Sequence, residues 1–175
     1  TYVNSDAISA GAYIAIATNE IAFAPYGQIG AAEAVSGGGG DIDAGMKRKI
    51  NSYLKAKIRN FSGEHRYRSR VMVAMMDANE TLLVEGEQPV AADGSLIQKE
   101  GELLSLTAEE SVKEYGDPPQ HLLGIGIYKT VDELLAAKYG EGNFEVVSME
   151  INWAEELGLW LSGVGPLILG LGMLL

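Results

Sequence analysis

The sequence predicts an α/β domain followed by a transmembrane helix. Over residues 1–152, short apolar segments typical of strands alternate with longer segments of helical periodicity, and residues 157–175 carry no charged side chain. At 175 residues the chain is long enough for one domain with a hydrophobic core and a short appendage. Its composition, 47% apolar and 21% charged, is typical of a folded protein rather than a disordered one. We therefore expect a domain at 1–152 and the start of a membrane region at 153–175.

The first third of the chain contains short elements punctuated by glycine and proline. Residues 36–40 form a Gly-rich loop, but no Gly-Lys-Ser/Thr follows it, so we do not expect it to bind phosphate. The expected elements are the end of a strand at 1–4, a helix at 7–18, a strand at 20–24 and a small apolar element at 28–35.

The rest of the domain is predicted to contain further helices and strands. Thr107 is expected to cap a helix, with Glu110 three residues later completing a capping box and Gly116 ending the helix. The other expected elements are helices at 43–61, 66–76 and 131–139, strands at 81–85 and 102–106 that pair in a hairpin or small meander, and a last strand at 144–151.

Charge and composition exclude several classes of function. The net charge of −11 argues against a nucleic-acid partner, and the Lys and Arg residues between positions 47 and 70 are interpreted as a solvated helix face. The chain has no cysteine, which excludes disulfides, thiolate metal sites and cysteine nucleophiles. His65 and His121 have no partner at metal-ligand spacing, so each is interpreted as structural or solvent-exposed. We expect no metal and no cofactor.

Ser9 is the candidate nucleophile. The small residues Ser9-Ala10-Gly11 follow a short extended segment and open a helix, so the serine hydroxyl lies at a helix N-terminus. There the unpaired backbone N–H groups and the helix dipole stabilise a developing negative charge, as acyl-transfer chemistry requires. The alternative is that Ser9 is an ordinary N-cap.

The C-terminal run predicts a membrane span. Its nineteen residues, 157–175, cover about 28 Å as a helix, close to the hydrocarbon thickness of a bilayer. Pro166 and several glycines suit a membrane helix better than a buried core helix, which is the alternative. No Lys or Arg follows Lys138, and this absence favours an extracytoplasmic soluble domain.

Several blocks in series resemble the protease domain of the NfeD family, which are membrane-bound serine proteases of the ClpP class related to signal peptide peptidase A. The matching blocks are 2–4, 7–15, 24–25, 28–35, 49–51, 58–59, 104–112 and 115–116, and they span nearly the whole chain. The resemblance implies a ClpP/crotonase-like spiral of ββα units, with its first strands missing because the chain starts after them. It also implies a serine endopeptidase that hydrolyses apolar segments of membrane-associated proteins.

The resemblance further implies particular site residues and partners. Ser9 corresponds to the nucleophile, and Lys49 to the general base, with Lys47 as a rival that the local pattern does not eliminate. A lysine is a competent base at neutral pH only when burial lowers its pKa. One oxyanion donor is the backbone N–H of Ala10, and the other comes from a Pro-Gly-Gly segment that would precede Thr1, so the fragment is expected to be impaired.

The expected partners are a peptide substrate, a stomatin-like membrane protein, the membrane itself and further copies of the chain. Two alternatives remain open. One is a non-catalytic scaffold with the ClpP fold, and the other is a crotonase-like acyl-CoA enzyme, against which the apolar C-terminus argues.

Overall fold

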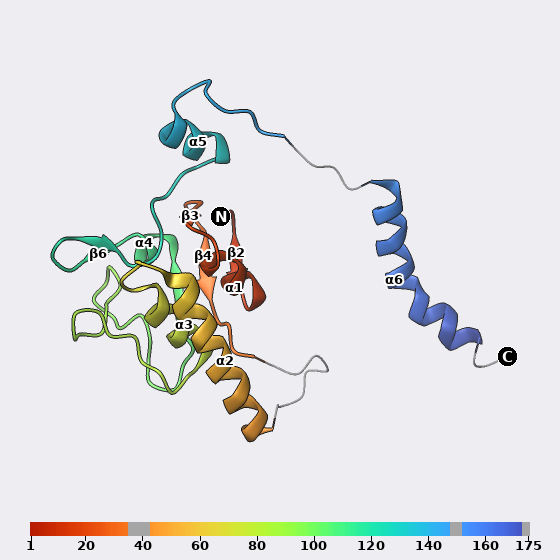
Figure 1. Cartoon of the computed structure of the whole chain (residues 1–175), viewed down its shortest axis with the longest axis horizontal. Helices are drawn as coiled ribbons and strands as arrows, with labels where there is room; N and C mark the ends of the chain where they lie inside the picture. Colours follow the sequence, from red (N-terminus) through yellow and green to blue (C-terminus); the bar gives the residue numbers. More distant parts are fainter. Residues whose placement is uncertain (35–42, 148–151, 173–175) are drawn as a thin grey trace.

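The structure is a computed structural model that describes residues 1–34, 43–147 and 152–172. Figure 1 shows most helices and strands gathered in one body, with the last helix apart from it. The helices are α1 (Ala10–Ile16), α2 (Ala44–Ser62), α3 (Arg68–Met76), α4 (Ala108–Ser111), α5 (Val131–Tyr139) and α6 (Trp153–Gly172). The strands are β1 (Tyr2–Val3), β2 (Asp6–Ile8), β3 (Ala22–Phe23), β4 (Gln28–Gly30), β5 (Ser105–Thr107), β6 (Glu114–Tyr115) and β7 (Gln120–His121).

The first four strands alternate between two small sheets. Strand β1 pairs in parallel with β3, and β2 pairs in parallel with β4, with Ile8 opposite Gly30. Each pair of consecutive strands therefore contributes one strand to each sheet before the next helix follows, first β1, β2 and α1, then β3, β4 and α2. The order strand, strand, helix thus occurs twice, and α1 lies in the crossover connection that each pair of parallel neighbours requires.

The core joins these strands to helices α1 and α3. Helix α3 is apolar on nearly every face, and such helices are buried; five of its apolar side chains are covered. Glycine is required at position 124, where the backbone passes close to the ring of Phe23, since a Cβ there would lie 2.5 Å from that ring. The larger buried side chains are Ile16, Ile21, Phe23, Ile29, Ile58, Tyr67, Met72, Met75, Met76, Leu82 and Leu104.

Three predicted helices are confirmed with small shifts of their ends. They are α2, α3 and α5, and α2 begins where Asp43 accepts hydrogen bonds from the backbone N–H groups of Gly45 at 2.9 Å and Met46 at 3.1 Å. The capping box at Thr107 and Glu110 is also confirmed, because each side chain accepts from the other residue's backbone N–H. A strand was expected at 20–24 and a small apolar element at 28–35, and β3 and β4 occupy part of each range.

Other boundaries and pairings were wrong. The helix expected at 7–18 begins only at Ala10, because Asp6–Ile8 pairs with β4 as a strand. The segment at 81–85 does not pair with 102–106. Instead, β5 lies antiparallel to β4, with Leu106 opposite Ile29. Helix α4 ends near Val112 rather than at Gly116, since Glu114–Tyr115 pairs with β7. Residues 144–147 form no strand, and the rest of that prediction, 148–151, lies outside the described residues.

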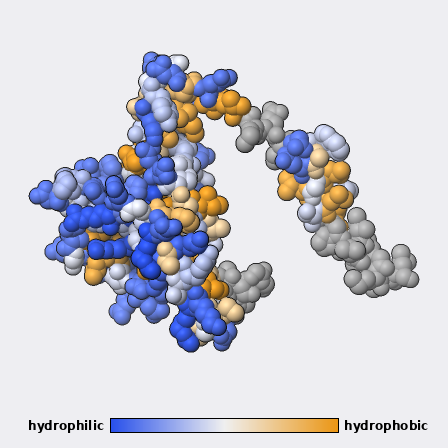
Figure 2. Space-filling view, viewed as in Figure 1, coloured by the Kyte–Doolittle hydropathy of each residue, from blue (hydrophilic) through white to orange (hydrophobic). Residues whose placement is uncertain are grey.

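Helix α6 covers most of the apolar C-terminal run. Side chains along its first half are exposed, among them Trp153, Leu159 and Trp160, and Figure 2 shows hydrophobic surface there. Among the helices in the described ranges, none combines the length and the apolarity that crossing a membrane requires. A membrane span over 157–175 therefore stays a prediction, and residues 173–175 lie outside the described part of the chain.

Candidate functional site

Ser9 occupies a strained turn between strand β2 and helix α1. Its backbone has φ 55° and ψ −119°, a combination that favours glycine. Although Ser9 stands at the N-cap position of α1, its side chain makes no capping hydrogen bond and the residue is exposed. The ordinary N-cap alternative is therefore wrong for this serine. A serine on a sharp strand-to-helix turn is the arrangement that presents a nucleophilic hydroxyl in hydrolases.

Strand β4 fixes the position of this turn. The backbone N–H of Ser9 donates to the carbonyl of Gly30 at 3.2 Å, which extends the β2–β4 ladder by one bond. Glycine is required at position 30, because a Cβ there would lie 2.5 Å from both the carbonyl oxygen of Leu104 and the Cα of Ser105 on the β5 side. Sequence reasoning missed the role of Gly30, although the glycine stands inside one of the matching blocks.

The start of α1 can supply a donor to an oxyanion. Ala10 is the first residue of the helix and directly follows Ser9. The first N–H groups of a helix have no partner within the helix, and the dipole there favours negative charge. The backbone N–H of Ala10 is thus in a suitable element for the predicted role, next to the candidate nucleophile.

The two candidate lysines lie on different faces of α2. Lys47 shares its face with Asn51, Leu54 and Ile58, at the spacing of three to four residues that places side chains on one side of a helix, and this face turns toward the body. The Nζ of Lys47 pairs with Oε1 of Glu33 at 2.6 Å. Lys49 is exposed, in a row with the exposed Tyr53 and Lys57. The burial that would make Lys49 a base is absent in the isolated chain.

Ser9 and Lys49 are not brought together directly. Both residues are described, and no hydrogen bond joins the hydroxyl of Ser9 to Nζ of Lys49 among the described contacts. Helix α2 does contact α1. Its buried residues, however, are Ile58 and Ser62, near its C-terminal end, whereas Lys47 and Lys49 stand near its start.

Two buried polar atoms lie on the helices that carry the site. The hydroxyl of Tyr13, one turn after Ser9 on α1, and Oδ1 of Asn51, one turn after Lys47 on α2, have no hydrogen-bond partner within the described ranges. Burial raises the pKa of Tyr13 to about 12. Uncompensated buried polar groups destabilise a fold and are concentrated at functional sites. The sequence carries no signal for either one, since burial depends on the tertiary fold.

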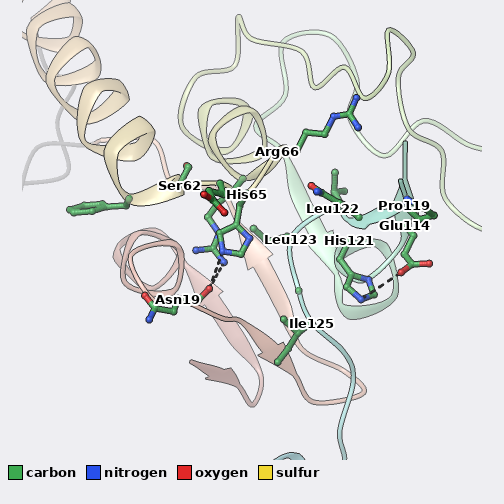
Figure 3. A pocket seen from close by; sticks show the side chains of 16 residues that line it. Asn19, Ser62, His65, Arg66, Glu114, Pro119, His121, Leu122, Leu123 and Ile125 are labelled. Carbon is green, nitrogen blue, oxygen red and sulfur yellow. Dashed lines mark hydrogen bonds and ion pairs between the residues drawn. The ribbon is translucent and has the colours of Figure 1, made fainter. Parts of the chain in front are cut away.

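The two histidines line a cavity of about 620 Å³ at the other end of α1 (Figure 3). Nε2 of His65 lies 3.1 Å from the carbonyl oxygen of Asn19, and Nδ1 of His121 lies 2.7 Å from that of Val112. Nε2 of His121 also lies 3.8 Å from a carboxylate oxygen of Glu114. Since Asn19 follows the C-terminus of α1 and Ser9 precedes its N-terminus, neither histidine belongs to the Ser9 site.

Buried Arg68 binds backbone carbonyl groups at the same end of α1. Its guanidinium donates to the carbonyl oxygens of Thr18 at 2.7 Å and Asn19 at 3.1 Å, where a cation complements the helix dipole. Burial lowers the pKa of Arg68. Within the described ranges, no three or more His, Asp or Glu side chains gather as a metal site would need.

Comparisons with known proteins agree with this architecture. The family model described as "NfeD1b, N-terminal domain" matches residues 1–143. The membrane protein NfeD1b of Bacillus subtilis (strain 168) is 27% identical over 178 residues, a match that covers 99% of this chain. It covers only 35% of that protein, so the chain spans about a third of the curated relative's length.

Two solved structures are similar as well, and both are of 1510-N, a membrane-bound stomatin-specific protease. A lysine-to-alanine variant of it in complex with a substrate peptide has a TM-score of 0.60 at 22% identity, covering 93% of this chain and 68% of that one. A serine-to-alanine variant has a TM-score of 0.51 at 25% identity, covering 79% of this chain and 54% of that one. The fold is thus shared with these proteases. Because the family model matches most of its length, the chain belongs to the NfeD family, as an NfeD1b N-terminal domain.

Proposed function

We propose that the complete protein is a serine endopeptidase in which Ser9 attacks the peptide carbonyl. The observation that carries this proposal is the strained backbone of Ser9, at φ 55° and ψ −119°, on an exposed strand-to-helix turn without a capping bond. Strain of about 1–3 kcal/mol persists at a site only where the surrounding fold imposes it, and functional turns are where it is found. The fold shared with a stomatin-specific protease supports the same function.

In the proposed reaction the hydroxyl of Ser9 adds to the carbonyl carbon and passes its proton to a neutral lysine amine. The carbonyl oxygen becomes an oxyanion, which the backbone N–H of Ala10 stabilises from the start of α1. The lysine then returns the proton to the leaving amine, and an acyl-enzyme remains for water to hydrolyse. We assign the activity to the complete protein, because this chain spans about a third of its curated relative.

Lys49 is the proposed base because it holds the position that the resemblance assigns to one. In the isolated chain it faces solvent, so the proposal requires the first half of α2 to be repositioned or covered. The buried residues of α2, Ile58 and Ser62, lie in its other half. Lys47, on the inner face and paired with Glu33, is the other candidate.

We propose apolar segments of membrane-associated proteins, including a stomatin-like protein, as substrates, and self-association of the protease. Residues 1–152 would form the protease domain on the extracytoplasmic side, and residues 153–175 would start the membrane region. Carbonate extraction of the complete protein from membranes tests insertion, and protease protection of a tagged protein tests the side. Release of the protein by carbonate would refute insertion.

The second candidate is a non-catalytic scaffold with the ClpP fold, which the outward position of Lys49 favours. The complete protein, its Ser9→Ala variant and an internally quenched apolar peptide separate the two. A peptidase loses essentially all cleavage in Ser9→Ala while its unfolding transition is retained. If the complete protein does not cleave the peptide, or Ser9→Ala cleaves it at the wild-type rate, the peptidase proposal is wrong.

A further inference from the structure

Helix α2 concentrates positive charge in an acidic protein. It carries six of the chain's 13 Lys and Arg residues and no Asp or Glu, whereas the whole chain has a net charge of −11. The rest of the chain is therefore even more acidic than the whole. An anionic surface attracts α2 and repels most of the remaining molecule, which orients the domain with α2 toward that surface. The six cations are Lys47, Arg48, Lys49, Lys55, Lys57 and Arg59.

The inner cations of α2 are neutralised and the outer ones are not. Lys47 pairs with Glu33, and Lys55 pairs with Asp77 at 3.2 Å and Glu80 at 2.7 Å. The hydrogen bonds that Lys55 donates to Glu80 and Asp77 raise its pKa, the one to Glu80 most, and burial opposes this rise. Arg48, Lys49, Lys57 and Arg59 form no salt bridge with any described carboxylate. All four of these unneutralised cations are exposed: Lys49 and Lys57 lie in the row of Tyr53, and Arg48 and Arg59 lie on the flank of α2 next to Lys55.

The N-terminal half of α2 also exposes apolar and aromatic side chains. Figure 1 shows the N-terminal end of α2 projecting from the body, and there Met46 is 52% exposed and Tyr53 62% exposed. Nζ of Lys57 lies 5.6 Å from the centre of the Tyr53 ring. A tyrosine flanked by lysines, with a thioether nearby, suits the headgroup level of a bilayer, where amphipathic rings are enriched.

A hollow of about 310 Å³ lies beside these cations, bordered by α2 and Asp77 at the end of α3. Three cations, Arg48, Lys55 and Arg59, line it against the one carboxylate of Asp77, and Ser52 adds a hydroxyl. Guanidinium groups bind phosphate oxygens through paired hydrogen bonds. This lining has the charge and the donors that a phosphodiester headgroup requires.

We propose that α2 docks on an anionic phospholipid surface, with Arg48 and Arg59 binding headgroup phosphates and Tyr53 at headgroup level. An acidic protein partner would account for the cations but not for the exposed apolar and aromatic side chains. The lipid surface also accounts for exposed Met46 and Tyr53 on the projecting half of the helix, which is the pattern of an interfacial basic helix. The contact would hold this face of the domain against the bilayer independently of the C-terminal run.

Lys49 lies on the same face, and an anionic surface stabilises its ammonium form. Lipid docking and the proton transfer proposed above therefore make opposite demands on Lys49. For this reason the test leaves Lys49 intact and measures binding rather than cleavage. The lipid proposal can then fail while the peptidase proposal holds, and the reverse.

The test compares two variants of the full chain that lose the same three charges. One is Arg48→Gln with Lys57→Gln and Arg59→Gln on α2, and its matched control removes Lys99, Lys113 and Lys129 by the same change to Gln. Vesicles of phosphatidylcholine alone and vesicles with one-third phosphatidylglycerol are sedimented with each protein. Since each cation near an anionic surface contributes about a fivefold affinity, the α2 variant should bind the mixed vesicles about 100-fold more weakly.

The control variant should keep nearly wild-type binding, and raising the salt from about 0.1 M to about 1 M should weaken wild-type binding, because it shortens the screening length. Helix α6 is unchanged in every protein, so its contribution to vesicle binding cancels.

Equal loss of binding in the two variants overturns the proposal, as does equal wild-type binding to both vesicle types. Displacement of bound protein by soluble polyglutamate of equal charge would identify an acidic protein partner instead. Should the triple variant lose its unfolding transition, Arg48→Gln with Lys57→Gln should still weaken binding about 25-fold.

Discussion

The backbone N–H of Ser9 donates to the carbonyl of Gly30, at 3.2 Å, and this one bond ties the candidate nucleophile to strand β4. Gly30 in turn is opposite Ile8 in β2 and opposite Ser105 in β5. The position of the serine therefore depends on how closely the three strands pack at their common end. Gly30, which is distant from Ser9 in sequence, is therefore decisive for the turn.

Gly30→Ala should destabilise the domain by at least about 1–3 kcal/mol, the usual range for overpacking. The added Cβ would lie 2.5 Å from the carbonyl oxygen of Leu104 and from the Cα of Ser105, so backbone must move. Urea unfolding measures the change. Gly11→Ala is the control, because its Cβ would meet Ala7 at 3.8 Å, an ordinary contact in a helix. Equal stability of the Gly30 variant and the wild type would refute the close approach.

Ser9→Gly should be more stable than Ser9→Ala by about 1 kcal/mol. Both variants lose the hydroxyl, but only glycine adopts φ 55° and ψ −119° without strain, which costs other residues about 1–3 kcal/mol. The greater freedom of glycine in the unfolded chain offsets part of this gain. Urea unfolding of the two variants side by side gives the difference. An Ala variant as stable as the Gly variant would mean that the turn is not strained.

Tyr13→Phe should leave the unfolding free energy unchanged near neutral pH or raise it by about 1–2 kcal/mol, because it removes a buried hydroxyl without a partner. Burial raises the pKa of Tyr13 to about 12, against about 10 in an unfolded chain. Above pH 10 the unfolded state therefore loses this proton first, and wild-type stability falls as pH rises toward 12.

The Phe variant should lack this part of the alkaline loss, as measured by urea unfolding at pH 7 and about 10.5. Tyr26→Phe is the matched control, since Tyr26 is 89% exposed and its hydroxyl meets solvent. If Tyr13→Phe and Tyr26→Phe respond alike at both pH values, the hydroxyl of Tyr13 is satisfied and the prediction is wrong.

Local patterns predicted the elements that local chemistry fixes. The helical spacing of α2, the capping box of Thr107 with Glu110, and the helix after Thr130 all depend on residues within a few positions of one another. Pairing between distant strands does not, which is why β5 was expected beside residues 81–85 and lies beside β4 instead. The start of α1 was misjudged for the same reason, because β4 holds Asp6–Ile8 as a strand.

The candidate site likewise has features that local sequence predicts and features that depend on the tertiary fold. Ser9 was proposed because small residues at a helix start mark the turn, and the role of its neighbour Ala10 was inferred from it. The backbone strain of Ser9, the contact with Gly30 and the burial of Tyr13 arise only when β4, β5 and α1 come together. Lys49 was chosen by family position, and helical geometry turns it to solvent while Lys47 faces inward.

The last prediction concerns which residue accepts the proton from Ser9. It is tested by cleavage of an apolar peptide by the complete protein. Lys49→Ala should reduce cleavage as far as Ser9→Ala does, because the two groups of a dyad act as one unit and their losses do not add. Cleavage should rise with pH, since only the neutral amine accepts a proton and a lysine is ordinarily protonated below about pH 10.4. Lys47→Ala should instead lower stability through the lost pairing with Glu33.

His65→Ala and His121→Ala should leave cleavage nearly unchanged, because both rings line a cavity at the far end of α1 from Ser9. Rate measurements on all five single variants and on the Lys49→Ala, Ser9→Ala double variant decide the assignment. If Lys47→Ala loses cleavage and Lys49→Ala retains it, the inward-facing lysine is the base, and α2 need not move for catalysis. If a histidine variant loses cleavage while its unfolding transition is unchanged, the Ser-Lys assignment itself is wrong.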